Sequence, residues 1–270
     1  DKAEDEKEKA TAINATALGI IGDEATRLGA LVVHFSTDYI FDGIKNTPYT
    51  ERDKPNPQSI YGQSKFAGEK LLKQRTSQHL ILRTGWIAST HGDNFLKKIL
   101  NLATKKDQLK VVNDQFGAPT SAAILASVTA FLVRQYQQFN KSIFPYGTYN
   151  VAANGVTNWH EYAQFLIAET LILGQQLKVK PENILPIDSE NYLTKAKRPQ
   201  NSCLNTELFS STFDFHLPFW QEEIRRILYL IFENKEIVGQ YSQISGLQSS
   251  ANFNKQKPKP WTAPRAKRAR

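Results

Sequence analysis

Apolar residues recur at helical and strand spacings along most of the chain. Residues 9–28 carry Ala, Ile and Leu at helical spacings and Gly29 follows, which predicts a helix closed by a glycine. The apolar run 31–36 predicts a buried parallel strand, and residues 42–57, with their Gly and Pro, predict a long loop. The same reasoning predicts helices over 59–74, 93–105, 121–139, 157–173 and 219–232, strands over 79–84, 109–112, 147–151 and 184–187, and an extended segment over 199–205.

Strands that alternate with helices through short connections are typical of α/β proteins. We therefore expect a Rossmann-like, doubly wound parallel sheet with helices on both faces. Ligands bind such sheets beyond the carboxyl ends of the strands. Residues that directly follow a predicted strand are thus the first candidates for chemistry.

Composition narrows the class of protein. A chain of 270 residues with 40% hydrophobic residues can bury a large core, and it has no apolar run near the roughly 18–20 residues that span a bilayer. Cys203 is the one cysteine, which excludes an intramolecular disulfide and a multi-cysteine zinc site. We expect Cys203 to be a packed thiol, and a reducing cytoplasm fits this cysteine usage.

The net charge of +8 lies almost entirely at the carboxyl end. Seven basic and no acidic residues follow Glu236, which leaves about +1 for the rest of the chain. The body therefore does not have the charge of a nucleic-acid-binding surface. We expect residues 237–270, rich in Gln, Ser, Asn, Lys and Pro, to be a disordered basic tail. Contact of this tail with nucleic acid or anionic lipid is the less favoured interpretation.

Two candidate groups follow the first predicted strands. Ser36, Thr37 and Asp38 come at the end of the strand 31–36 and offer two hydroxyls and a carboxylate to a ligand, although Thr37 and Asp38 are also common in turns. Trp86 leaves the strand 79–84 and could stack on a sugar or a base, or simply cover the sheet edge.

Tyr61 and Lys65 lie four residues apart in the predicted helix 59–74, so they share one face. A nearby ammonium favours the phenolate form, and we expect Lys65 to lower the pKa of Tyr61 from its ordinary value near 10. Such a pair makes a proton donor. The bare pattern is weak, since chance predicts about one occurrence in this chain.

Taken together, these segments resemble the dTDP-4-dehydrorhamnose reductases, a family of extended short-chain dehydrogenases. The most specific shared motif is Asp-Gln-Phe-Gly-Ala-Pro-Thr, residues 114–120, and the resemblance extends to about residue 234. It implies hydride transfer from NADPH or NADH to C4 of a dTDP-4-keto-6-deoxy sugar. The implied catalytic residues are Tyr61, Lys65 and Thr37, the cofactor contacts Tyr61, Lys65 and Ser36, and the substrate contacts Thr37, Asp38, Trp86, Asn94, Gln115 and Arg198.

The resemblance also implies a division of the chain. Residues 1–112, with segments returning from about 121–160, would belong to the dinucleotide-binding domain, and 113–236 mainly to a smaller interleaved α/β substrate domain. The family's phosphate-binding turn, Gly-x-x-Gly-x-x-Gly, has no counterpart here. We therefore expect a sheet incomplete at its amino end and a chain that is unstable or inactive alone. The choice between NADH and NADPH would lie in the missing segment.

Two alternatives stay open. A sugar-nucleotide epimerase or dehydratase would share Tyr61 and Lys65, but residues 114–120 favour the reductase. A non-catalytic regulatory subunit of the methionine adenosyltransferase type would keep the fold, although retention of Thr37, Tyr61 and Lys65 disfavours it. The five histidines show no metal-ligand spacing. A homodimer, with Mg²⁺ at its interface, is known among relatives, but no ligands for it can be named here.

Overall fold

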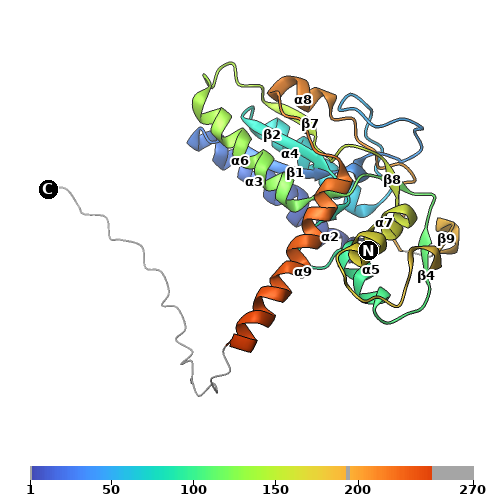
Figure 1. Ribbon diagram of the computed structural model, residues 1–270. Coiled ribbons are helices and arrows are strands. Elements are labelled where there is room, and N and C mark those ends of the chain that lie inside the picture. The colour runs from blue at the N-terminus through green and yellow to red at the C-terminus, as the bar shows by residue number, and fades with distance from the viewer. Residues whose placement is uncertain (1, 193–194, 245–270) are drawn as a thin grey trace, which may run out of the picture. The chain divides into compact units, whose positions relative to one another are not determined.

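Three parallel strands form the central sheet of this computed structural model, which describes residues 2–192 and 195–244 (Figure 1). Strands β1 (Val32–Thr37), β2 (His79–Thr84) and β7 (Gly147–Asn150) lie in the order β1-β2-β7. Val32 pairs with His79 and Thr37 pairs with Thr84, so β1 and β2 end together. The predicted Rossmann-like parallel sheet is confirmed.

Helices cover both faces of this sheet. On one face, α3 (Ala17–Leu28) and α4 (Ile60–Arg75) pack against β2 through Leu18, Leu72 and Ile81. On the other, α6 (Ala122–Gln138) and α8 (Glu207–Phe213) bury a larger apolar cluster. That cluster includes Leu80, Leu82, Leu125, Val128, Leu132, Phe209 and Phe213.

The helix predicted over residues 9–28 consists of three successive helical pieces after the short α1 (Lys2–Asp5). They are α2 (Lys7–Thr11), the π-helical turn η1 (Ala12–Thr16) and α3, which Gly29 closes at a φ of 62°. A Cβ on Gly68 of α4 would lie 2.0 Å from the Asn14 carbonyl oxygen. Glycine at this position therefore lets α4 touch the backbone of η1.

A second core lies outside the central sheet. Helices α5 (Phe95–Ala103) and α7 (Trp159–Ile172) pack with β4 (Leu109–Val112), β9 (Ile184–Ile187) and the first turns of α9 (Trp220–Ile244). β4 is not part of the central sheet, because it pairs in parallel with β9. Residues up to Phe232 form one compact unit, so the division near residue 112 stays a prediction.

Several short elements carried no periodic signal in the sequence. Strands of two residues pair as β3 with β6 and as β5 with β8, and single helical turns lie between longer elements. Their bounds are β3 (Ile87–Ala88), β5 (Phe116–Gly117), β6 (Thr120–Ser121), β8 (Thr157–Asn158), η2 (Asp38–Ile40), η3 (Pro181–Asn183) and η4 (Ser189–Asn191).

Helix α9 extends to Ile244 and so includes the first residues of the predicted tail, whose disorder stays a prediction. The rest of the predicted tail lies outside the described residues. Within the ranges that the structure describes, no helix has the length and apolarity to cross a membrane.

Candidate active site

The candidate site is built at the carboxyl ends of β1 and β2. Thr37 is the last residue of β1, and its hydroxyl donates a 2.9 Å hydrogen bond to Asp38 Oδ1 and accepts one from the Tyr39 backbone amide. Asp38 is 2% exposed, and this burial raises its pKa to about 6. A Cβ on Gly85 would lie 2.7 Å from the Asp38 carboxyl group, so a glycine there leaves room for it.

Tyr61 lies beside Thr37 in the first turn of α4. The Ser59 side chain caps this helix by accepting a hydrogen bond from the Gly62 amide. A Cβ on Gly62 would come within 2.2 Å of the Tyr39 carbonyl oxygen, so this glycine lets the helix start against the turn after β1. The rings of Tyr61 and Tyr39 meet edge to face at 5.8 Å. Tyr61 is 39% exposed and therefore reachable from solvent.

The predicted lowering of the Tyr61 pKa is not found. Burial raises the pKa of Tyr61, and a hydrogen bond involving the Thr37 side chain opposes only part of that rise. The physical reason is the direction of Lys65. Its ammonium group donates a 2.6 Å hydrogen bond to the Phe35 carbonyl oxygen and lies 3.3 Å from His34 Nε2, so it contacts β1 rather than the phenol.

A buried ion pair that the sequence did not predict involves Glu69, four residues after Lys65 on α4. The Arg83 guanidinium donates hydrogen bonds of 3.0 and 2.7 Å to the two carboxylate oxygens of Glu69. Burial alone would raise the pKa of Glu69, but these bonds outweigh it and hold that pKa below its ordinary value. Ser36 lies beside Glu69 and helps to lower this pKa. Ser36 is 5% exposed, and its role as a cofactor contact stays a prediction.

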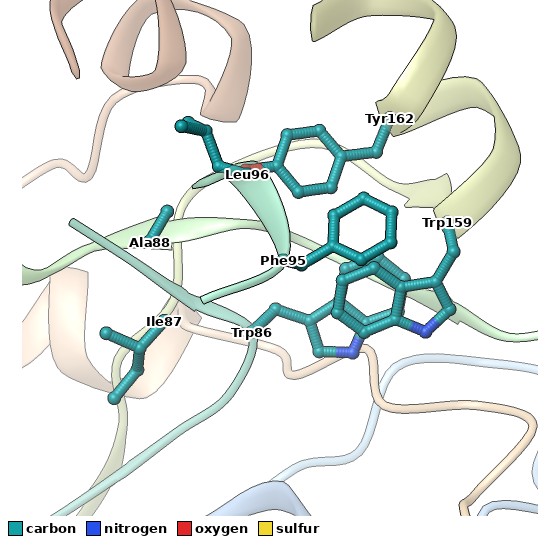
Figure 2. A pocket seen from close by; sticks show the side chains of 7 residues that line it. All are labelled: Trp86, Ile87, Ala88, Phe95, Leu96, Trp159 and Tyr162. Carbon is teal, nitrogen blue, oxygen red and sulfur yellow. The ribbon is translucent and has the colours of Figure 1, made fainter. Parts of the chain in front are cut away.

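Trp86 is one of the side chains that line an aromatic pocket (Figure 2). Its indole stacks on Trp159 with ring centroids 3.5 Å apart, and a Cβ on Gly117 would lie 2.5 Å from it. The Trp86 backbone has a φ of 48°, which is uncommon for a residue other than glycine. With Trp159 on one face of the indole, Trp86 has less surface for ligand stacking than predicted. The pocket is lined by Trp86, Ile87, Ala88, Phe95, Leu96, Trp159 and Tyr162.

The other three predicted substrate contacts, Asn94, Gln115 and Arg198, lie in different surroundings. Asn94 caps α5, accepting a hydrogen bond from the Lys97 amide and donating one to the Ser89 carbonyl, so its side chain already has a structural role. Gln115 is buried just before β5. Arg198 is exposed; burial raises the pKa of Tyr39 to about 12, and the charge of Arg198 opposes part of that rise, which places Arg198 near the candidate site.

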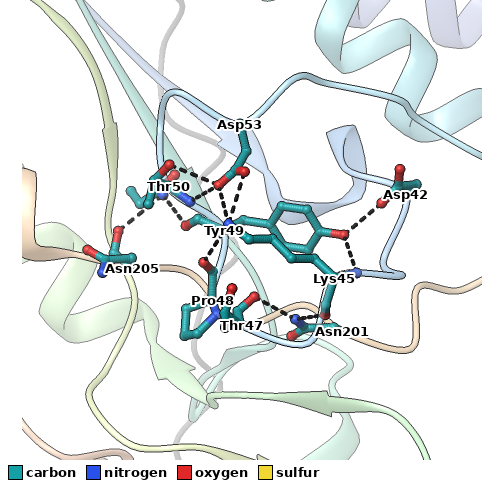
Figure 3. Close-up of polar contacts among 10 residues, drawn as sticks. Asp42, Lys45, Thr47, Pro48, Tyr49, Thr50, Asp53, Asn201 and Asn205 are labelled. Carbon is teal, nitrogen blue, oxygen red and sulfur yellow. Dashed lines mark hydrogen bonds and ion pairs between the residues drawn. The ribbon is translucent and has the colours of Figure 1, made fainter.

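The long loop over residues 42–57 is ordered by polar contacts with the segment after Pro199 (Figure 3). Tyr49 donates a 2.7 Å hydrogen bond to Asp42, and Lys45 forms an ion pair with Asp53 at 2.8 Å. Asn201 donates hydrogen bonds to the carbonyl oxygens of Lys45 and Thr47. These contacts hold the loop and the predicted extended segment together. They also place Cys203 nearby as a buried free thiol, as predicted, and burial raises its pKa to about 11.

The residues at this site fit one part of a nicotinamide cofactor, its ribose. Lys65 has three hydrogen-bond donors, and the described residues offer acceptors for two of them, Phe35 and His34. One donor therefore stays available for a ribose hydroxyl at the edge of the sheet. Among the described residues there is no group of three or more His, Cys, Asp or Glu side chains that could hold a metal ion.

Comparison with known proteins decides the family. The model of the family described as "RmlD substrate binding domain" matches residues 1–231. The chain belongs to this family. A member from Shigella flexneri named dTDP-4-dehydrorhamnose reductase is 42% identical over 237 residues, which cover 88% of this chain and 78% of that protein. The reductase of the same name from Escherichia coli K12 has the same identity and coverage.

Solved structures of the family agree with the fold described above. A dTDP-4-dehydrorhamnose reductase from Clostridium acetobutylicum superposes with a TM-score of 0.77 at 34% identity, over 86% of this chain and 77% of that one. The reductase from Bacillus anthracis, solved in complex with NADP, has a TM-score of 0.75 at 31% identity, over 84% of this chain and 75% of that one. The resemblance predicted from the sequence motifs is thus confirmed.

Proposed function

We infer that this chain is an oxidoreductase that reduces dTDP-4-dehydro-L-rhamnose to dTDP-L-rhamnose, with NADPH or NADH as the reductant. The single observation that carries this inference is the meeting of Tyr61 and Thr37 at the ends of β1 and β2 in a chain of the reductase family. The bound nicotinamide would supply the hydride to C4. The protein must supply a proton to the C4 oxygen and hold both reactants.

Tyr61 is the proposed proton donor. Its raised pKa keeps the phenol protonated at neutral pH, which is the form that a general acid needs. Because the side chain is 39% exposed at the sheet edge, a sugar can approach its hydroxyl. A proton transferred to the C4 oxygen as negative charge develops there would complete the reduction.

Thr37 is proposed to stabilise the same oxygen. Its hydroxyl is 2.9 Å from Asp38 Oδ1 and hydrogen-bonds with Tyr61, so it lies between a carboxylate and the proton donor. The hydroxyl carries one proton, which Asp38 accepts here, so the hydroxyl would turn that proton to the C4 oxygen when the sugar binds. Asp38, Trp86 and Arg198 are proposed sugar-nucleotide contacts around this point, and Asn94, which caps α5, and Gln115, which is buried, are weaker candidates.

Lys65 is proposed to bind the ribose of the cofactor. Two of its donors are held on β1, so the ammonium cannot swing freely, and the third can meet a ribose hydroxyl. A homodimer, an Mg²⁺ ion at its interface and a cytoplasmic location stay predictions.

Because the family's phosphate-binding turn has no counterpart in these 270 residues, the test is turnover of dTDP-4-dehydro-L-rhamnose by the protein purified from expression of its whole gene. We expect one NADPH or NADH to be oxidised for each dTDP-L-rhamnose formed, as measured by loss of the reduced cofactor's absorbance and by chromatography of the product. Conversion of the sugar without net loss of the cofactor would indicate an epimerase or dehydratase. Binding of a partner enzyme, without turnover, would indicate a regulatory subunit. Either result would contradict the proposal.

A further inference from the structure

The ammonium of Lys65 contacts strand β1 and not Tyr61, which shares its helix face. Both of its contacts, the Phe35 carbonyl oxygen at 2.6 Å and His34 Nε2 at 3.3 Å, belong to β1. β1 lies at the margin of the three-stranded sheet, next to β2 on one side. The Phe35 contact lies two residues before Thr37, the last residue of β1, so the ammonium is held near the carboxyl end of this strand.

The contact of Lys65 with His34 is one of two contacts between facing residues of α4 and β1. His34 and Ser36 lie two residues apart in the strand and so project from the same face. Lys65 and Glu69 lie four residues apart in the helix and also share a face. His34 meets Lys65, and Ser36 lies beside Glu69. Arg83 lies opposite Ser36 on the neighbouring strand β2 and forms the ion pair with Glu69.

The charges around His34 determine what its ring can do. Burial, and then the charge of Lys65, lower the pKa of His34 to about 4, while Glu69 opposes this. The ring is therefore neutral at neutral pH. A neutral imidazole accepts a hydrogen bond at one nitrogen only, so an Nε2 that accepts from Lys65 requires the ring proton on Nδ1.

We propose that His34 is a positioning residue for Lys65, its neutral ring accepting a hydrogen bond from the ammonium so that the remaining donor faces the cofactor ribose. This inference rests on the proposed cofactor contact of Lys65. Without His34, one of the two acceptors is lost, and the flexible lysine side chain can rotate about its contact with Phe35. Loss of this contact should therefore lower the affinity for the cofactor and leave the affinity for the sugar nucleotide unchanged.

The first test is independent of catalysis. Nitrogen-15 NMR of the ring nitrogens is tractable because the chain has five histidines. At neutral pH we expect the His34 proton on Nδ1 and a bare Nε2. In the variant Lys65→Met we expect the titration midpoint of His34 to rise, because a neighbouring positive charge has been removed. A proton on Nε2, or a midpoint that does not move, would overturn the pairing.

The second test separates positioning from a merely structural role. His34→Leu removes the acceptor at similar volume, whereas His34→Gln keeps an oxygen that can reach the same place. We expect His34→Leu to weaken NADPH binding about tenfold, the effect of one hydrogen bond to a charged group, and His34→Gln to restore most of it. Calorimetry with NADPH and, separately, with dTDP-L-rhamnose measures this. The affinity for the sugar nucleotide should not change.

His79→Leu is the matched control. His79, the first residue of β2, is also half-buried and makes a hydrogen bond through Nδ1, but its partner is the carbonyl oxygen of Thr76 at the end of α4. We expect this variant to keep the NADPH affinity of the unmodified protein. Equal losses in His34→Leu and His34→Gln, or in His34→Leu and His79→Leu, would reject a positioning role. If the protein fails to reduce the sugar while the NMR result holds, the proposed function fails and the pairing of His34 with Lys65 stands.

Discussion

Glu69 and Arg83 form a two-point ion pair in the interior of the protein, with the side chains 0% and 3% exposed. The pair joins α4, which carries Tyr61 and Lys65, to β2. It therefore fixes the helix of the proposed proton donor relative to the sheet that carries Thr37. The ring of Phe41 lies 5.4 Å from the same guanidinium and adds a cation–π contact.

Removing one partner of this pair should be costly. Glu69→Gln leaves the Arg83 guanidinium buried without a matching charge, and we expect the free energy of unfolding to fall by about 3–5 kcal/mol. Urea denaturation at neutral pH measures this. The exposed pair Lys9–Glu6 offers a control, since Lys9→Gln should cause no measurable change. A Glu69→Gln protein as stable as the unmodified one would show that water or another group compensates Arg83.

Asp38 should make the protein less stable as the pH rises. Its pKa is about 6 in the folded protein against an ordinary value of 3.8, so the folded state holds the proton more tightly than the unfolded state. The free energy of unfolding should then decrease between about pH 4 and pH 6, by up to about 3 kcal/mol. The variant Asp38→Asn should abolish this pH dependence of the free energy of unfolding.

The variant Asp38→Asn therefore has a pH-dependent signature. We expect it to be more stable than the unmodified protein at pH 7 and nearly equal to it at pH 4, in urea denaturation at both values. The amide oxygen can still accept the Thr37 hydroxyl, so local geometry should survive. A variant that is less stable at pH 7 would mean that the Asp38 carboxylate is stabilised where it lies.

Tyr61→Phe should abolish most turnover. Loss of a general acid lowers rates by about 10²–10⁴-fold, while the ring that contacts Tyr39 is retained. We expect the affinity for dTDP-L-rhamnose to stay within a factor of about two, since the hydroxyl is one contact among several. Steady-state kinetics and calorimetry measure the two quantities. Tyr136→Phe is the control, because its hydroxyl contacts Gln78 ahead of β2, and its turnover should not change.

Gly117→Ala should displace Trp86. The added Cβ would lie 2.5 Å from the indole, a distance that side chains do not tolerate, so Trp86 must move off Trp159. We expect weaker binding of dTDP-L-rhamnose and a loss of about 1–3 kcal/mol of stability from overpacking. Tryptophan fluorescence and calorimetry follow the two effects.

Gly19→Ala provides the contrast to this variant. Its Cβ would meet Leu71 at an ordinary 3.6 Å in the interior of α3. Alanine is the better helix former, so we expect this variant to gain about 0.5–1 kcal/mol and to bind the sugar nucleotide unchanged. Equal stability losses in the two glycine variants would show that the close approach of Trp86 to residue 117 has no particular effect.

The sequence by itself determined the order and type of the main elements. Strand 79–84 and strand 109–112 have the predicted bounds, and the start of α4 lies within one residue of its prediction. The physical reason is that a helical or strand period repeats within a few residues, so it is written locally in the chain. The rule that ligands bind beyond strand ends selected Thr37, and the four-residue spacing to Lys65 on one helix face selected Tyr61.

Only the tertiary structure decided where side chains distant in sequence meet. Lys65 and Tyr61 share a helix face, yet Lys65 contacts His34 and Phe35 because β1 presents acceptors closer to its ammonium than the phenol. The pairing of β4 with β9 likewise depends on a fold that joins residues more than seventy positions apart. Such contacts depend on how separate elements pack, and no periodicity within one segment encodes them.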